Sequence, residues 1–171
     1  VTSIGGYAFT NCTGFTSITI PDQVTSIYDG AFTNCTGLTS IDIPDSVSSI
    51  GNSLFSGCKK LTRVNIGKAL NFIKFYGICE NTGITHVNII DGITSIMNYT
   101  FSNCTSLTSI TIPNSVTSFG CYAFYYCTGL TSITIPDSVT SIGSSAFSDC
   151  TGLISVTYKG TSNPGKHSSN I

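Results

Sequence analysis

A 23-residue spacing runs through the whole chain and restricts its fold more than any other feature. Six cysteines lie at positions spaced by multiples of 23 residues, and we call these the lattice positions. Asn81 stands at the one lattice position that lacks a cysteine. Ile78 lies three residues before Asn81, where the other units have Phe. A large apolar residue follows each lattice position by three residues. Because the spacing does not slip over 171 residues, the sequence predicts seven copies of one structural unit. The lattice cysteines are Cys12, Cys35, Cys58, Cys104, Cys127 and Cys150.

Each unit contains the pattern of a short strand followed by a turn. The stretch LTSITIP at 130–136 alternates apolar and β-branched polar residues, which indicates a β-strand that ends at the proline. A second extended stretch, VTSI, follows, and then G-x-x-A-F-x-x-C, as at 143–150. Residues that favour helix N-caps stand near the start of this last segment, so we expect a single 3₁₀ or α turn there. They are Asp29, Asn52, Asn98 and Ser144.

One unit is too small to bury its own apolar residues. Stacked copies would place Ile on Ile and Phe on Phe and so form one continuous core. The sequence therefore predicts a β-rich solenoid with a parallel sheet along one face. Short extended segments and single helical turns would complete each coil. At about 4.8 Å between strands, seven coils would span roughly 30–35 Å.

The fuller pattern CTGLTSITIPDSVTSIGSSAF, at 127–147, resembles one narrow class of leucine-rich repeat. It is similar to the BspA-like repeats of surface proteins from anaerobic bacteria and parasitic protists. The resemblance covers residues 1–158, which form an array whose first coil is incomplete. Residues 159–171 are left as a non-repeat tail. The stretch YKGTSNPG at 158–165 also resembles the segment near the end of such arrays. The family implies a curved leucine-rich repeat solenoid, cell-surface or secreted, that recognises host or matrix proteins. It supplies no catalytic residues to transfer.

Composition excludes several other classes of function. The net charge is −1 and only 9% of residues are charged, so no global field favours nucleic acid or an anionic membrane. No apolar run approaches the length of a membrane span. The motifs of nucleotide-binding, hydrolase and zinc-protease sites are missing from the sequence, and no cofactor is expected. We therefore predict that the protein is not an enzyme. The given sequence begins with Val1 and shows no signal peptide.

The cysteines are predicted to be buried free thiols rather than a disulfide framework. The lattice cysteines stand between core positions, where Cys acts as a small apolar residue. Side chains in equivalent places of stacked coils point in parallel, which opposes the torsion of a disulfide. Cys79 and Cys121 are off the lattice, and Cys121 is the best candidate for an exposed thiol. No cysteine or histidine pair has the spacing of a zinc site.

One group of units departs from the Thr-Ser-Thr pattern at the outward strand positions. Side by side, the replacements would form a polar patch that could bind a protein or glycan; single-stranded nucleic acid is a weaker alternative on this nearly neutral chain. A second interpretation is that these units have decayed and only still pack. The patch residues are Asp42, Arg63, Asn65, His86 and Asn88. Basic and aromatic residues that could extend the patch are Lys59, Lys60, Lys68, Phe72 and Lys74.

Three further expectations concern modification, the ends of the array and its role. Four Asn-x-Ser/Thr sequences could accept glycans in a eukaryotic secretory pathway, or could be turn residues of the repeat: Asn11, Asn34, Asn98 and Asn103. Residues 1–14 carry core residues with no coil above them, which predicts self-association through this end. The alternative to a binding module is a structural spacer or self-assembling array without a specific ligand.

Overall fold

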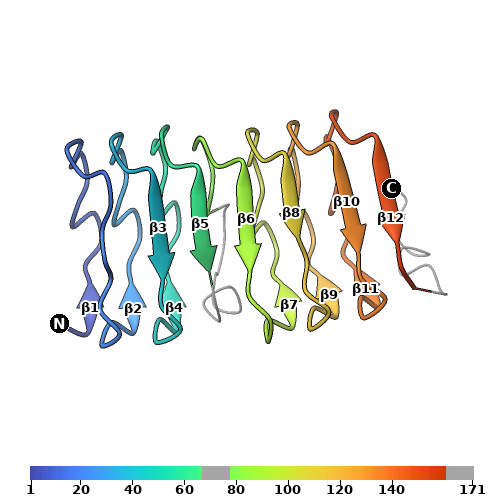
Figure 1. Ribbon diagram of the computed structural model, residues 1–171, viewed down its shortest axis with the longest axis horizontal. Coiled ribbons are helices and arrows are strands. Elements are labelled where there is room, and N and C mark those ends of the chain that lie inside the picture. Colours follow the sequence, from blue (N-terminus) through green and yellow to red (C-terminus); the bar gives the residue numbers. More distant parts are fainter. Residues whose placement is uncertain (67–77, 161–171) are drawn as a thin grey trace.

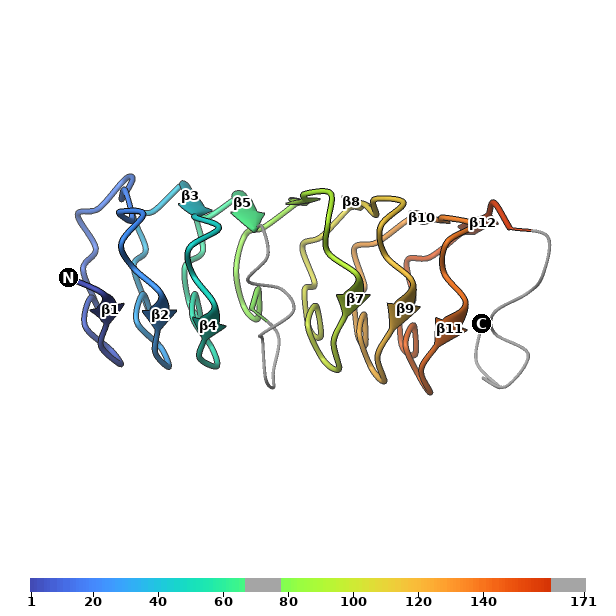
Figure 2. The ribbon, with the colours of Figure 1, turned by 90° about the horizontal axis from the view of Figure 1, so that it is seen from below.

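The computed structural model describes residues 1–66 and 78–160, and these form a β-solenoid of stacked coils (Figures 1 and 2). The coils follow one another along the long axis, with β1 and β12 at opposite ends of the array (Figure 1). Neighbouring strands are parallel throughout, and paired residues are 23 positions apart, as in Ser40 with Arg63. The predicted parallel-strand solenoid is confirmed.

Longer strands form one face of the solenoid. The sheet on this face has the order β3-β5-β6-β8, and β10 and β12 pair beyond it. Figure 1 shows all six strands side by side along this face. Their bounds are β3 (Ser40–Ile43), β5 (Arg63–Ile66), β6 (His86–Ile89), β8 (Ser109–Thr111), β10 (Ser132–Ile135) and β12 (Ser155–Tyr158).

Two-residue strands line a second face, visible in Figure 2. They form the sheets β1-β2-β4 and β11-β9-β7, again with every pair parallel. These strands are the VTSI stretches of the repeat, where Ile or Phe points inward. Their bounds are β1 (Ser3–Ile4), β2 (Ser26–Ile27), β4 (Ser49–Ile50), β7 (Ser95–Ile96), β9 (Ser118–Phe119) and β11 (Ser141–Ile142).

The segment between the short strand of one coil and the long strand of the next is called the turn segment here. The expectation of a helical turn in it is wrong, because residues 1–66 and 78–160 contain no helix. Alternate N–H groups bond to the next coil instead, as in Phe101 N–H to the Ala123 carbonyl (2.8 Å) and Asn103 N–H to the Tyr125 carbonyl (2.8 Å). A continuous helix would keep these donors within its own segment.

Two of the expected N-cap residues bridge neighbouring coils. The Asp29 carboxylate accepts the backbone N–H of Asn52 at 2.7 Å. The Asn98 side-chain oxygen accepts the N–H of Cys121 at 2.8 Å. The N-cap role expected for these two residues is therefore wrong, because the N–H groups that they accept lie one coil further along the chain.

The core consists of ladders of equivalent side chains. The Phe side chains stack in two runs of three, with ring centroids 5.1–5.8 Å apart and Ile78 buried in the coil between the runs. Ile and Val from the strands alternate inward with outward polar residues, as the pattern of β6 shows. The two runs are Phe9, Phe32, Phe55 and Phe101, Phe124, Phe147.

The lattice cysteines are small core residues with one polar contact. The Cys58 thiol donates to the Phe32 carbonyl in the preceding coil at 3.0 Å, and three other lattice thiols make the same contact. All eight cysteines are free thiols, and only Cys12 and Cys121 are partly exposed. Burial raises the pKa of Cys58 to about 12, which keeps this thiol protonated.

Cys79 is buried although it lies off the 23-residue lattice. In the other coils the residue just before the lattice position has a left-handed backbone conformation. In the coil of Cys79 this conformation occurs at the lattice position itself, Asn81 (φ 55°). The Cys79 thiol lies beside that of Cys104. Burial, together with the neighbouring thiols of Cys127 and Cys79, raises the pKa of Cys104 well above its usual range.

Candidate functional site

The strand face carries the polar patch predicted from the sequence. Asp42, Asn65 and Asn88 pair with one another across β3, β5 and β6, and Arg63 pairs with His86 in the adjacent row. All five side chains are exposed or half-buried, whereas the intervening Val64 and Ile66 are fully buried. Alternation along each strand therefore places the five residues on one surface. We call these five residues the strand-face patch.

The strand-face patch interrupts two rows of small hydroxyl residues. Thr19 precedes Asp42 in one row, and Thr111 follows Asn88 at its other end. In the other row Ser40 precedes Arg63, and Ser109 follows His86. The charged and amide side chains thus occupy three adjacent coils, and the coils on both sides return to Ser and Thr.

Hydrogen bonds orient the polar side chains within this surface. The Asn65 amide donates to the Asp42 carboxylate at 2.5 Å. His86 Nδ1 and the Thr85 hydroxyl are 2.9 Å apart. Equivalent threonines elsewhere bond instead to the backbone of the preceding coil, as Thr62 does to the Thr39 carbonyl at 3.3 Å. The Thr85 hydroxyl thus has a different partner in this coil, and that partner is a patch residue.

A shallow hollow of about 210 Å³ lies at the side of the patch next to β8. Its lining combines a guanidinium, an imidazole, an amide and two hydroxyl groups, from Arg63, His86, Asn88, Ser109 and Thr111. The hollow holds no carboxylate, while Asp42 lies in the neighbouring strand and already accepts a bond from Asn65. This arrangement offers several hydrogen-bond donors and positive charge to a polar partner.

The other residues suggested for the patch are less closely placed. Lys59 and Lys60 are exposed in the turn that leads into β5, before the strand face begins. Lys68, Phe72 and Lys74 lie outside the described residues.

The asparagines of the four possible glycosylation sequences have backbone roles. Asn11, Asn34 and Asn103 have φ angles of 62°, 57° and 60°, a left-handed conformation that Asn tolerates better than most residues. Asn98 uses its side-chain oxygen to bond the next coil. These observations support the turn interpretation, and glycosylation stays a prediction.

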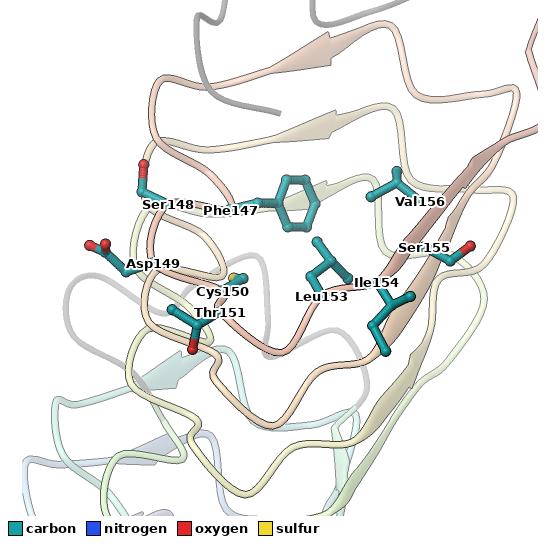
Figure 3. A pocket seen from close by; sticks show the side chains of 9 residues that line it. All are labelled: Phe147, Ser148, Asp149, Cys150, Thr151, Leu153, Ile154, Ser155 and Val156. Atoms are coloured by element: carbon teal, nitrogen blue, oxygen red, sulfur yellow. The ribbon is translucent and has the colours of Figure 1, made fainter.

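Apolar residues are exposed near both ends of the described array, with Ile154 and Val156 exposed near the C-terminal end. At the C-terminal end a hollow of about 560 Å³ is lined by the last members of the ladders, including Phe147, Cys150 and Leu153 (Figure 3). At the N-terminal end Val1 is 95% exposed and Phe15 is 36% exposed. The lining of the C-terminal hollow mixes apolar and hydroxyl side chains and has one acid, Asp149, so it does not form a paired-carboxylate site. Self-association through the N-terminal end stays a prediction.

The sequence-based interpretation missed a group of tyrosines on the turn segments. Tyr99, Tyr122, Tyr125 and Tyr126 form a continuous set of ring contacts. The signal was present in the sequence, because YAFYYC at 122–127 replaces GAFTNC of the unit at 30–35. This departure from the repeat lies in the turn segment and not at the outward strand positions.

The described residues contain neither a metal-binding cluster nor a membrane-spanning helix. Among residues 1–66 and 78–160, no three His, Cys, Asp or Glu side chains gather closely enough to hold a metal ion. Within the same ranges no helix has the length and apolar character needed to cross a membrane.

Comparisons with known proteins agree on the type of repeat. The family described as BspA type leucine rich repeat region (6 copies) matches residues 1–98 and 75–167. No curated protein matches. A leucine rich cell surface protein from Faecalibacterium prausnitzii is 35% identical over 95% of this chain, with a TM-score of 0.66. A leucine rich repeat protein from T. pallidum is 31% identical over 82% of this chain, with a TM-score of 0.52.

Both of these solved structures are longer than this chain. The matched part is 44% of the F. prausnitzii chain and 57% of the T. pallidum chain. The family match extends over nearly all of the sequence, and the repeat spacing coincides with the observed strand register. The chain therefore belongs to the BspA-type leucine-rich repeat family.

Proposed function

We propose that this array is a recognition module, at the cell surface or secreted, that binds a protein partner through its strand face. The observation that carries the proposal is the strand-face patch. Five polar or charged residues from three coils meet on one surface whose neighbouring positions hold Ser and Thr. A solenoid does not need these side chains for stacking, because they point away from its core.

The chemistry of the patch suits a polar protein surface. Arg63 is the kind of residue that often contributes much of the binding energy at interfaces. Asn88 and the hydroxyl groups around the hollow add directional hydrogen bonds. The name of the F. prausnitzii relative places that protein at the cell surface, which supports the same location for this array.

A spacer role is the second candidate, and the regularity of the other coils favours it. A stiff spacer requires only that each coil stacks on the next. A spacer role does not explain why Arg63 and His86 stand where the neighbouring coils have serine, at Ser40 and Ser109.

Two substitutions separate the candidates without disturbing the fold. Arg63→Ser combined with His86→Ser restores the residue type found in neighbouring coils. The wild type and this variant would be compared by surface plasmon resonance against a panel of purified extracellular-matrix proteins. A recognition module should lose at least tenfold in affinity for its partner, about 1.4 kcal/mol.

A control variant on the same face shows whether the effect is local. Ser132→Ala and Thr134→Ala alter outward positions of β10, away from the strand-face patch. This variant should bind as the wild type does. If the panel contains a partner whose affinity is the same for all three proteins, the strand-face patch is not its binding site.

A further inference from the structure

The tyrosine cluster lies on the turn segments, away from the strand-face patch. Tyr99 and Tyr122 stack with their centroids 5.0 Å apart, and Tyr125 meets Tyr122 edge-on at 5.7 Å. Tyr126 extends the group, with its ring 6.0 Å from that of Tyr125. The cluster spans two adjacent coils.

Tyr126 stands at a backbone position that disfavours it. Its φ is 59°, in the left-handed region where a bulky side chain is unusual. Equivalent positions in other coils hold residue types that tolerate this conformation: Asn11, Asn34, Gly57, Asn103 and Asp149. The Tyr126 side chain remains 45% exposed, so burial offsets little of this cost. Tyr7, Tyr99 and Tyr122 have similar left-handed angles (φ 57–60°) at another position of the repeat, so Tyr126 is distinguished by its place in the column of Asn, Gly and Asp residues.

One acidic residue lies beside the cluster. Asp149 occupies the position equivalent to Tyr126 in the next coil, and its carboxylate raises the pKa of the exposed Tyr125 hydroxyl. The sequence contains no Lys or Arg between Lys74 and Lys159. Of the acidic residues in that interval, Asp149 is the one that acts on a cluster residue. The local charge thus opposes an anionic ligand.

We propose that the tyrosine cluster and Asp149 form a second binding surface, which accepts Lys or Arg side chains of a partner protein. The face of an aromatic ring attracts a cation through its quadrupole. The Asp149 carboxylate adds charge beside the rings, and tyrosine provides large contact area with few rotatable bonds. The surface is independent of the strand-face patch. Neutral sugars also stack on aromatic rings, but the Asp149 carboxylate favours a cationic partner.

Tyr126→Asn tests the proposal because it restores the residue type of the equivalent coils. The probe is a fluorescent oligolysine peptide, measured by fluorescence polarisation against protein expressed in bacteria, where the new Asn-Cys-Thr sequence stays unmodified. Tyr126→Asn should weaken binding at least fivefold and raise the melting temperature by roughly 2–4 °C. Asp149→Asn should also weaken binding and reduce its salt dependence.

Matched variants distinguish ring contact from general attraction to an acidic protein. Tyr126→Phe keeps the ring and should retain most of the affinity. Tyr28→Ser removes a tyrosine that is 55% exposed outside the cluster and should bind as the wild type does. Unchanged oligolysine binding by Tyr126→Asn would overturn the proposal. So would a fall in its melting temperature, or Tyr126-dependent binding of neutral oligosaccharides in place of oligolysine.

Discussion

The strand face and the turn segments depart from the repeat in different ways. On the strand face, Arg63 and His86 replace serine at positions that point to solvent, where the backbone conformation suits almost any side chain. In the turn segments, Tyr126 replaces Asn at a left-handed backbone position. A change on the strand face costs little stability, so it can arise by drift as well as by selection. A bulky residue at a left-handed position has a cost, which makes the turn segments the less tolerant of the two regions, although Tyr7, Tyr99 and Tyr122 show that the repeat accepts tyrosine in this conformation.

The largest expected effect comes from the core beneath the turn segments. Phe101 is fully buried and stacks on Phe124 at 5.4 Å. Phe101→Ala should lower the free energy of unfolding by about 3–5 kcal/mol, because it removes this packing and leaves a cavity. Chemical denaturation followed by circular dichroism measures the change. A loss below about 1 kcal/mol would show that the ladder tolerates a gap and that each coil is more independent than its stacking implies.

The buried thiols should make stability depend on alkaline pH. The pKa of Cys58 is raised to about 12 by burial, from an ordinary value of 9.0. In the unfolded chain this thiol loses its proton above pH 9, while the folded protein retains it until about pH 12. The folded protein therefore binds more protons across this window, and stability falls as pH rises, by about 1 kcal/mol at pH 10 for Cys58.

A variant isolates the contribution of Cys58 to this pH dependence. Denaturation midpoints at pH 8 and pH 10 would be compared for the wild type and Cys58→Ala. The variant should be less stable at pH 8 but should lose less on going to pH 10. An identical loss in both proteins would assign the alkaline dependence to other groups.

Bonds between adjacent turn segments should have smaller but measurable effects. Asn98→Ala removes the acceptor of the Cys121 N–H bond, and the expected loss of stability is about 1 kcal/mol. Asn88→Ala, on the strand face, is the matched control because it truncates the same residue type. If the two variants lose equal stability, the turn segments are no more constrained than the strand face.

The smallest effect is expected for the strand-face patch itself. Arg63→Ser with His86→Ser should change the free energy of unfolding by less than about 0.5 kcal/mol, as is usual for surface substitutions. A larger loss in thermal or chemical denaturation would mean that these side chains stabilise the stacked coils. The proposal that they are retained for binding would then lose its main support.

The sequence by itself determined the register of the solenoid and the membership of the strand-face patch. Each coil contacts its neighbours at a constant offset, so a spacing of 23 residues in the sequence becomes adjacency in space. This is why Asp42, Asn65 and Asn88 could be predicted to lie in one row. The inward positions of the Phe and Cys residues follow from the same regularity.

Only the tertiary structure decided the conformation of the turn segments and what gathers on them. Their N–H groups alternate between local carbonyls and carbonyls of the next coil, and this choice depends on a neighbour that local helix propensity does not include. The left-handed angle at Tyr126 and the inward position of Cys79 follow from it. So does the tyrosine cluster, because ring contacts between coils depend on the directions that the turn backbone imposes on each side chain.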